Sequence, residues 1–308
     1  MGLFDKIKGP VFIKDSCTME EQLAALIEAK KTAPPEIAKK LERDIQNINA
    51  GNFGENSIIF ELKNSHFPML ILHDLCLEHD GLTGQIDFLI ITHRHIYVVE
   101  CKNLYGNMEI DSNGNFTRVV RINGRHSKEG IYSPITQNQR HLELIKQIRS
   151  AEKGNILTKA LFERGFYGTY IPLVVLANAK TVLNAKYAKK EVKEKVIRAD
   201  QIISYIRDFD AASKTATMSE KEMERLAQFF LDSHKDNSAD YAKKYSDATE
   251  KASDEENVSA TTTSEHRVLC PKCGALMIKR TAGRGQNAGK SFYGCPNFPK
   301  CRGIVNIG

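Results

Sequence analysis

The first feature that suggests chemistry is a set of charged and polar side chains in an otherwise apolar stretch, residues 85–103, QIDFLIITHRHIYVVECKN. The polar break at residues 92–95, between β-branched and aromatic runs, predicts a tight hairpin. A turn centred on this break places Asp87 opposite Glu100, with Cβ atoms about 4.5–5.5 Å apart. Because side chains alternate along a strand, one face of the hairpin then carries Gln85, Asp87, Glu100 and Lys102.

Two carboxylates this close repel each other unless a cation lies between them, so the pair suits a divalent metal ion. The competing interpretation is that these charges extend into solvent at the strand ends. Neighbouring segments offer Glu55, at the start of a helical segment, and Gln137 and His141, on one face of a later helix. Each also has a structural explanation: Glu55 as an acid favoured by the helix dipole, and the other two as surface polar residues.

Capping residues and apolar periodicity predict the elements that must position these side chains. Five helix starts are predicted, at Thr18, Pro34, Ser133, Asp200 and Ser219. Gly51 is expected to end the second helix, and a separate helical segment then covers residues 52–63. Strands are expected at residues 69–74, 85–91, 96–102, 108–111, 116–122 and 170–178. Helices on both sides of a central run of strands indicate a mixed α/β domain.

Four motifs in this region resemble, in order and spacing, the NERD (nuclease-related) domain. They are Gly54-Glu55, Gln85-Ile86-Asp87, Val99-Glu100-Cys101-Lys102-Asn103 with Gly106, and Pro134-x-x-Gln137-x-x-x-His141. The resemblance covers roughly residues 45 to 160, and that family is similar to the PD-(D/E)xK nuclease superfamily. The usual Asn before the proline is Ser133 here, a departure that affects helix capping more than chemistry.

This resemblance implies a restriction-endonuclease-like fold, a mixed sheet flanked by helices. In that scheme Asp87 and Glu100 hold Mg²⁺, and Glu55 completes the shell. Lys102 positions and activates the attacking water, and Gln137 supports the site from its helix. The residue types suit this chemistry, because Mg²⁺ prefers hard oxygen ligands and an ammonium group stabilises the charge that develops on phosphate.

The sequence contains seven cysteines, an odd number that favours metal ligation in a reducing compartment over a disulfide framework. Four of them form a C-x2-C and C-x5-C pattern: Cys270, Cys273, Cys295 and Cys301. Thiolates at this spacing form tetrahedral Zn²⁺ sites, and the metal supplies most of the folding energy of so short a module. Disulfides are the alternative. The remaining Cys17, Cys76 and Cys101 are interpreted as buried or incidental thiols.

Residues 268–303, which include CPKCGALMIKR and GKSFYGCPNFPKC, resemble the C-terminal zinc ribbons of type IA topoisomerases, which bind single-stranded DNA. The resemblance implies phosphate contacts from Arg280, Arg284, Lys290 and Arg302. Phe292 is expected in the small core of the module, and Tyr293 is a better candidate than Phe292 for stacking on bases, with Phe298 nearby. The rest of the chain lacks any sign of a topoisomerase cleavage centre, so the protein is not predicted to be one.

The net charge of +6 is concentrated in this C-terminal module. Residues 265–308 contain eight Lys or Arg and one acid, a net charge of +7, which leaves about −1 for the rest of the chain. Acidic polymers, DNA above all, are therefore the expected partners. The patterns predict four segments: an N-terminal helical segment at 1–50, a nuclease-like α/β domain at 45–232 with its motif core at 50–160, a flexible linker at 233–265, and the zinc ribbon at 266–308.

No apolar run approaches the ~20 residues that a membrane helix needs, and the N-terminus lacks the apolar core of a signal peptide. A weak amphipathic anchor through Leu3, Phe4 and Ile7 is the alternative. We therefore expect a cytoplasmic, nucleoid-associated protein with no membrane partner. The leading hypothesis is a Mg²⁺-dependent nuclease, delivered to DNA by its zinc ribbon and acting in DNA processing or repair. The rival is a non-catalytic DNA-binding accessory protein with the same fold, associated with DNA topology or repair.

Overall fold

The structure is a computed structural model that describes residues 7–15, 19–122, 124–235, 269–273, 275, 277–281 and 290–306. The chain divides into two compact units, Met1–Ser246 and Asp247–Gly308. Several predicted features lie outside the described residues: the N-terminal segment 1–6, Cys17, the helix start at Thr18, residues 236–265 of the linker, and Arg284.

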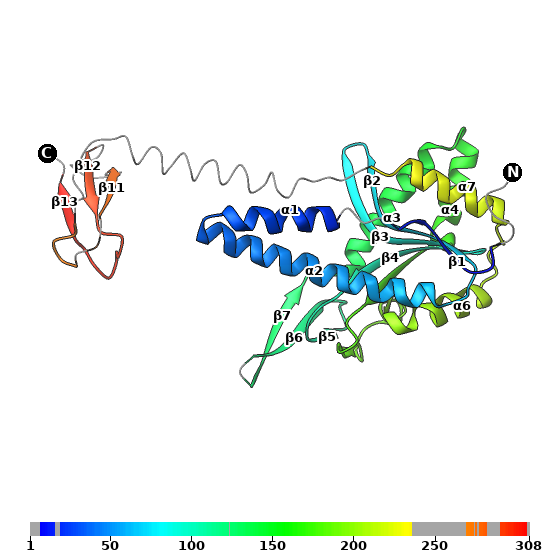
Figure 1. Ribbon diagram of the computed structural model, residues 1–308, viewed down its shortest axis with the longest axis horizontal. Coiled ribbons are helices and arrows are strands. Elements are labelled where there is room, and N and C mark those ends of the chain that lie inside the picture. The colour runs from blue at the N-terminus through cyan, green and yellow to red at the C-terminus, as the bar shows by residue number, and fades with distance from the viewer. Residues whose placement is uncertain are drawn as a thin grey trace. The chain divides into compact units, whose positions relative to one another are not determined.

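The larger unit is built on a six-stranded mixed sheet (Figure 1). In spatial order its strands are β1 (Pro10–Lys14), β2 (Met69–His79), β3 (Leu82–Ile91), β4 (Ile96–Lys102), β8 (Tyr170–Leu176) and β10 (Val196–Arg198). The strands β2, β3 and β4 are antiparallel, whereas β1 pairs in parallel with β2, and β8 pairs in parallel with both β4 and β10. The predicted α/β class is therefore confirmed.

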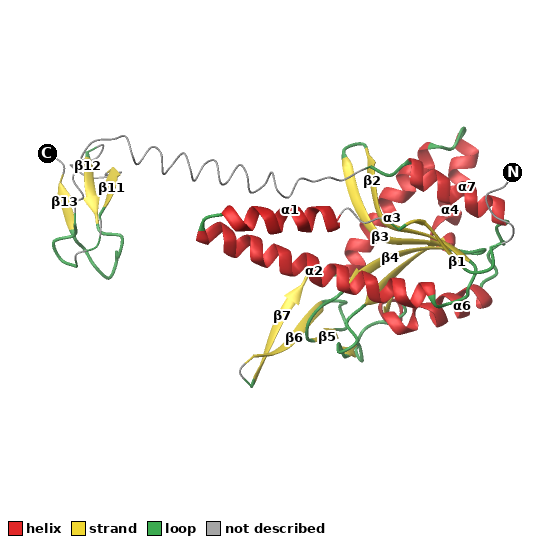
Figure 2. Ribbon diagram, viewed as in Figure 1, coloured by secondary structure: helices red, strands yellow, loops and turns green. Residues whose placement is uncertain are grey.

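Helices pack on both faces of this sheet (Figure 2). One face is covered by α3 (Pro134–Ala151), α4 (Ile156–Thr169) and α7 (Glu220–Asp232). The other face is covered by α2 (Pro35–Lys63) and α6 (Ile202–Ala212), the latter preceded by the 3₁₀ turn η1 (Ala199–Gln201). Because side chains alternate along the strands, Leu89 and Val98 join the first core while Phe88 and Val99 join the second.

Two of the predicted helix starts are confirmed by their capping hydrogen bonds. The Ser133 hydroxyl accepts a hydrogen bond from the Thr136 amide at 3.3 Å, which satisfies one of the free amides at the start of α3. Ser219 and Glu222 form a reciprocal capping box at the start of α7. The helix α3 carries Gln137 and His141. By fixing the first turn of α3, the Ser133 cap helps to position these two side chains.

The helix α2 is a single element of 29 residues. Its first half packs against α1 (Met19–Thr32) in a small core that contains Leu26 and Leu41. Its second half packs on the sheet through Ile58 and Leu62. Glu55 lies in this second half of α2, the part that packs on the sheet.

The prediction that Gly51 ends this helix was wrong, because the helix continues through both Gly51 and Gly54. A Cβ atom at Gly54 would lie 2.6 Å from the Cβ atom of Asn103, just beyond β4. Glycine costs about 1 kcal/mol in a helix relative to alanine. Here that cost is offset by packing, since the absence of a side chain allows α2 to approach the end of β4.

A second sheet of four strands lies beside β8. Its strands, in spatial order, are β7 (Arg125–Ile131), β6 (Phe116–Ile122), β5 (Asn107–Ile110) and β9 (Leu183–Asn184). Met108, Ile110 and Phe116 pack with Val174 and Leu176 of β8 in a separate apolar core, close to the short helix α5 (Lys190–Lys193). The sequence predicted β5 and β6, but it gave no signal for β7 or α4.

The smaller unit contains a three-stranded antiparallel sheet of β11 (Ile278–Thr281), β12 (Ser291–Gly294) and β13 (Ile304–Asn306). Its core includes Cys270, Met277 and Cys295, with Tyr293 packed against them. Among the described helices of the whole chain, none is both long and apolar enough to cross a membrane.

Candidate active site and metal centres

The predicted β3–β4 hairpin is confirmed in its register. Ile91 pairs with Ile96 and Leu89 pairs with Val98 across the turn. The regular pairing ends one pair further along, at Phe88 with Val99. Beyond this point the two strands carry Asp87 and Glu100, so the predicted carboxylates lie where the ladder of backbone hydrogen bonds stops.

Asp87 replaces the missing ladder bond with its own side chain. Its Oδ2 atom accepts a hydrogen bond from the Cys101 amide at 2.6 Å. The regular β3–β4 pairing ends at Phe88 and Val99, so it does not extend to the expected pair of Gln85 with Lys102. On its other side, toward β2, Gln85 remains paired with Cys76. The strands β3 and β4 therefore separate at Asp87, and the carboxylate lies in the opening.

Glu100, Lys102 and Gln137 form one hydrogen-bonded group on the α3 side of the sheet. The Lys102 ammonium lies 2.6 Å from Glu100 Oε1 and 3.1 Å from Gln137 Oε1. Glu100 is only 2% exposed, while the Lys102 side chain retains 24% of its exposure. A nearly fully buried carboxylate is thus paired with an ammonium group that solvent can still reach.

His141, one turn beyond Gln137 on α3, faces the same carboxylate. Its Nδ1 atom lies 3.5 Å from Glu100 Oε2, and neither atom has a hydrogen-bond partner among the described residues. Burial, and then the charge of Lys102, lower the pKa of His141 to about 4. His141 is therefore neutral at neutral pH and does not neutralise Glu100.

Glu55 reaches the site region from α2, on the opposite face of the sheet. Its Oε2 atom lies 2.8 Å from His73 Nε2 of β2, and the His73 ring stacks on Phe88 with centroids 4.7 Å apart. Glu55 is thereby held by a neighbour that the sequence analysis did not single out. The available signal was the polar pair His73-Asp74 inside the apolar run LILHDLCL.

Asp74 is the second residue that the sequence analysis missed. It is buried and has a positive φ of 55°, a conformation that non-glycine residues seldom adopt. The Lys14 ammonium of β1 donates to the backbone carbonyls of both His73 and Asp74, at 3.0 and 2.8 Å. The Gln85 side chain donates to Asp74 Oδ1 at 2.6 Å, so β1, β2 and β3 are joined beside the site.

A separate candidate centre lies in the smaller unit. The Sγ atoms of Cys270, Cys273, Cys295 and Cys301 all lie within 4.8 Å of one another. The distances from Cys270 Sγ to Cys301 Sγ and from Cys273 Sγ to Cys295 Sγ are 3.7 and 3.4 Å. Zinc–sulfur bonds of about 2.3 Å in a tetrahedron separate sulfurs by nearly the same distance. The four cysteines are therefore positioned to bind zinc, as the sequence predicted.

Two family models match this chain. Residues 50–177 match the nuclease-related domain, NERD, and residues 267–307 match the topoisomerase DNA-binding C4 zinc finger. Both resemblances noted in the sequence are thus confirmed, with the separated strands and the Glu100–Lys102 pair inside the first match and the four cysteines inside the second. No curated protein and no solved structure gives a significant match to the chain.

The electrostatics of the nuclease-related domain favour a bound cation at Asp87 and Glu100. Burial is the largest cause that raises the pKa of Asp87 well above its usual range, and the charges of Glu100 and Glu55 add to it. Burial also raises the pKa of Glu100, although the charge of Lys102 and its hydrogen bond oppose the shift. A divalent ion bound between these two acids would favour their ionised forms and so oppose the effect of burial on their pKa values.

The donor set also fits magnesium. Glu55, Asp87 and Glu100 supply only hard carboxylate oxygens, which Mg²⁺ prefers, and Glu100 Oε2 is buried without a hydrogen-bond partner among the described residues. Within the described part of the chain, however, only the four cysteines bring their ligand atoms within 4.8 Å of one another. Each carboxylate instead has a protein partner: His73 for Glu55, the Cys101 amide for Asp87, and Lys102 for Glu100.

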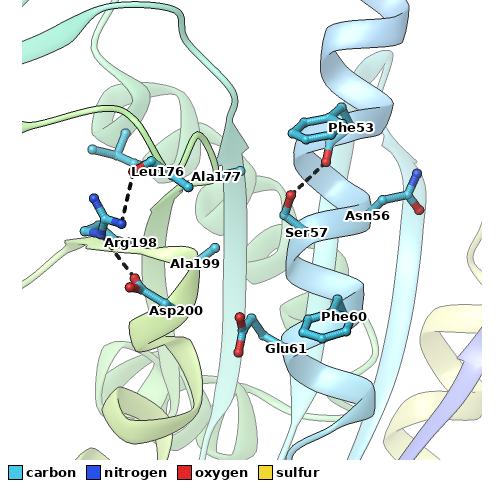
Figure 3. A pocket seen from close by; sticks show the side chains of 11 residues that line it. Phe53, Asn56, Ser57, Phe60, Glu61, Leu176, Ala177, Arg198, Ala199 and Asp200 are labelled. Atoms are coloured by element: carbon cyan, nitrogen blue, oxygen red, sulfur yellow. Dashed lines mark hydrogen bonds and ion pairs between the residues drawn. The ribbon is translucent and has the colours of Figure 1, made fainter.

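A cavity of about 420 Å³ lies along the flank of α2 (Figure 3). Phe53, Ser57 and Phe60 line it from the helix, and Ala177 and Arg198 line it from the strand side. None of the five predicted catalytic residues lines this cavity. The predicted catalytic residues therefore lie around the point where β3 and β4 separate, and not in this cavity.

In the zinc finger, the nucleic-acid residues predicted from sequence fall in different places. Arg280, Lys290 and Arg302 are exposed, as phosphate contacts require. The prediction that Phe292 joins the core was wrong: Tyr293 packs against the cysteine cluster, together with Val305, its partner in β13. The exposed aromatic side chain in the described part of this unit is Phe298, which is 61% exposed.

Proposed function

We propose that the nuclease-related domain hydrolyses phosphodiester bonds in DNA with the help of Mg²⁺. The observation that carries this proposal is the buried Glu100 with its partly exposed Lys102, placed beside Asp87 where β3 and β4 separate. A structural ion pair alone does not require a second, unneutralised carboxylate next to it. The family match to a nuclease-related domain supports the same reaction class.

In this proposal each residue has a defined task. Asp87 and Glu100 hold the metal ion, and Glu55 completes its surroundings from α2. When bound, Mg²⁺ neutralises charge on the phosphate and polarises the reacting oxygens. Lys102 orients the attacking water and favours its ionised form, because a positive ammonium group stabilises a nearby hydroxide. The 2.6 Å contact with Glu100 Oε1 keeps this group next to a proposed metal ligand. Gln137 fixes the Lys102 ammonium through the 3.1 Å hydrogen bond from that group to Gln137 Oε1.

The C4 zinc finger would deliver this domain to DNA. Four cysteines positioned for zinc and the exposed cations Arg280, Lys290 and Arg302 support binding to a phosphate backbone. We propose a preference for single strands, with Phe298 as the stacking side chain in place of Tyr293, because Phe298 is the exposed aromatic. We also propose, as the sequence predicted, that the protein acts in the cytoplasm at the nucleoid.

The test uses the zinc-loaded full chain with fluorescently labelled single- and double-stranded DNA, with or without added Mg²⁺ and without a chelator. The proposal predicts cleavage only with Mg²⁺, and its loss in Asp87→Asn and in Lys102→Ala. Lys102→Ala should still bind Mg²⁺, whereas Asp87→Asn should bind it weakly because an amide is a poor ligand. The matched control is Lys159→Ala, an exposed lysine of α4, which should cut like the parent protein.

A specific observation favours the alternative of a non-catalytic DNA-binding protein. Each candidate carboxylate already has a protein partner: Glu100 has Lys102, Asp87 has the Cys101 amide, and Glu55 has His73. In that case the charges would be structural. Tight DNA binding by the parent protein without cleavage, on substrates of either polarity and with Mg²⁺ or Mn²⁺, would establish the alternative.

A further inference from the structure

The strands β6 and β7 form a two-stranded ribbon, residues Phe116–Ile131, that projects from the larger unit (Figure 1). Each strand has seven residues, and β7 is the edge strand of its sheet. From Arg125 to Gly130 every residue of β7 is exposed. Charged side chains on an exposed edge strand hinder its pairing with other chains, and residues 125–130 also remain accessible to a ligand because only Ile131 of β7 packs on a core.

This basic ribbon carries an excess of positive charge in a unit that is otherwise close to neutral. It contains Arg118, Arg121, Arg125 and Lys128 against a single acid, Glu129. Glu129 pairs with Arg118 at 2.6 Å, and Lys128 pairs with Glu109 of β5 at 2.6 Å. The side chains of Arg121 and Arg125 are exposed and have no ion-pair or hydrogen-bond partner among the described residues, so their charges face solvent.

The register places these charges on both faces of the ribbon. Arg121 pairs with His126, and Val119 pairs with Lys128, so Arg121, His126 and Lys128 share one face. Arg125 lies one residue from His126 and therefore on the opposite face, together with the Arg118–Glu129 pair. A two-faced cationic ribbon can reach two phosphate backbones at once.

The ribbon lacks the means to bind single strands by stacking. Between Phe116 and Ile131 the sequence TRVVRINGRHSKEG contains no Phe, Tyr or Trp. Sequence-tolerant binding of single strands depends on such aromatic platforms. A groove of duplex DNA, in contrast, admits a two-stranded β-ribbon between its two phosphate backbones.

The ribbon is anchored next to the proposed active site. The small sheet begins directly after β4, and the loop between them contains Gly106, with a φ of 100°. A Cβ atom at Gly106 would lie 2.6 Å from the Val119 carbonyl oxygen of β6. The backbone of the ribbon therefore lies against the chain four residues beyond Lys102, so DNA held by the ribbon is held near that residue.

We propose that the basic ribbon inserts into a groove of duplex nucleic acid and that Arg121 and Arg125 contact its two phosphate backbones. This inference rests on the proposed function, and it narrows the substrate class. The domain would take a duplex, while the zinc finger takes single-stranded DNA. Substrates that join a duplex to a single-stranded segment then engage both units of the chain.

The test measures binding and not cleavage, so it is independent of whether the site turns over. Arg121→Ala/Arg125→Ala in the zinc-loaded full chain is titrated without added Mg²⁺ and without a chelator, with a blunt duplex and with a single-stranded oligonucleotide, over a range of salt concentrations. Loss of two phosphate contacts should reduce the slope of log affinity against log salt by about 2 for the duplex. Single-strand affinity should remain that of the parent protein.

The matched control is Lys221→Ala/Arg225→Ala, which removes two exposed cations from α7, packed against β1 and β2. This variant should keep the parent salt slope on both substrates. An unchanged duplex slope in Arg121→Ala/Arg125→Ala, or an equal loss on duplex and single strand, would overturn the proposal. Duplex binding through the ribbon together with no cleavage would retain the inference and refute the nuclease instead.

Discussion

Replacing Lys102 with methionine tests the electrostatic balance of the site, because it removes the ammonium group and keeps much of the side-chain volume. Glu100, which is 2% exposed, then loses the partner that lies 2.6 Å away. Breaking a buried ion pair costs about 3–5 kcal/mol. Since the Lys102 side chain is still 24% exposed, water screens part of the interaction, and we expect about 3 kcal/mol.

The sign of the pH dependence follows from the direction of the pKa shift. Burial raises the pKa of Glu100 in the folded protein, and removal of Lys102 raises it further. Because the folded-state pKa is raised, the loss of stability caused by the ionised Glu100 is absent below the unfolded-state pKa, which is about 4.3 for glutamate. The penalty grows as pH rises from that value through the folded-state pKa. The variant should therefore approach the stability of the parent protein in mild acid.

Thermal melts at several pH values, with and without Mg²⁺, measure these effects. For a domain of this size about 3 kcal/mol corresponds to a Tm lower by roughly 6–12 °C. Mg²⁺ at 100 times its Kd contributes about 2.7 kcal/mol, so it should restore most of the loss. Lys102→Met/Glu100→Gln, which removes both charges, is the control and should recover stability without the metal. A variant that melts like the parent at neutral pH, or that ignores Mg²⁺, would refute this reasoning.

Three further predictions concern other parts of the molecule. Cys273→Ser should release zinc and weaken DNA binding while the larger unit melts unchanged; one zinc retained per chain in metal analysis would exclude four-cysteine ligation. Asp210→Asn should cost about 2–4 kcal/mol at neutral pH in chemical denaturation, because His95 at 2.5 Å and Tyr97 at 2.6 Å lose a buried anionic partner. Burial alone would raise the pKa of Asp210, but those hydrogen bonds lower it, so its contribution is present above the unfolded-state pKa and lost as pH falls through the folded one. Gly54→Ala should lower stability by moving α2 from the end of β4, where the added Cβ meets another carbon at 2.6 Å; a Tm equal to the parent would show that the helix adjusts freely.

The hairpin that carries the candidate site could be predicted from sequence because its information is local. The polar break at residues 92–95 fixed the register from Ile91 and Ile96 onward. Alternation then placed Glu100 and Lys102 on one face, where they meet Gln137 of α3. Local periodicity could not reveal that the strands separate at Asp87, because that depends on neighbouring elements.

The residues that the sequence analysis missed depend on contacts between distant segments. Lys14 donates to the carbonyls of His73 and Asp74, about sixty positions further along the chain. Neither segment contains a local pattern that predicts this contact. The positive φ of Asp74 follows from that environment and not from a turn motif. The unbroken helix through Gly51 has the same origin, since tertiary packing outweighed the local propensity of glycine.

The basic ribbon shows how averaging over sequence can hide a surface. Outside the C-terminal module the net charge is about −1, so the count gave no reason to expect a cationic surface. The strand β7, RHSKEGI, has no apolar alternation because it is exposed along most of its length. Only the pairing of β6 with β7 brings Arg121, Arg125 and His126 to one end of the ribbon.

The central claim is that the residues around Lys102 hydrolyse phosphodiester bonds. The most direct measurement is the rate of DNA cleavage by the full chain in Mg²⁺, compared between the parent protein and Lys102→Ala at equal Mg²⁺ occupancy measured by calorimetry. We predict Mg²⁺-dependent cleavage by the parent protein and none by Lys102→Ala, although the variant binds both DNA and Mg²⁺. A Lys102→Ala protein that cuts DNA at the parent rate would contradict the mechanism, and a parent protein that binds DNA without cutting it would contradict the function.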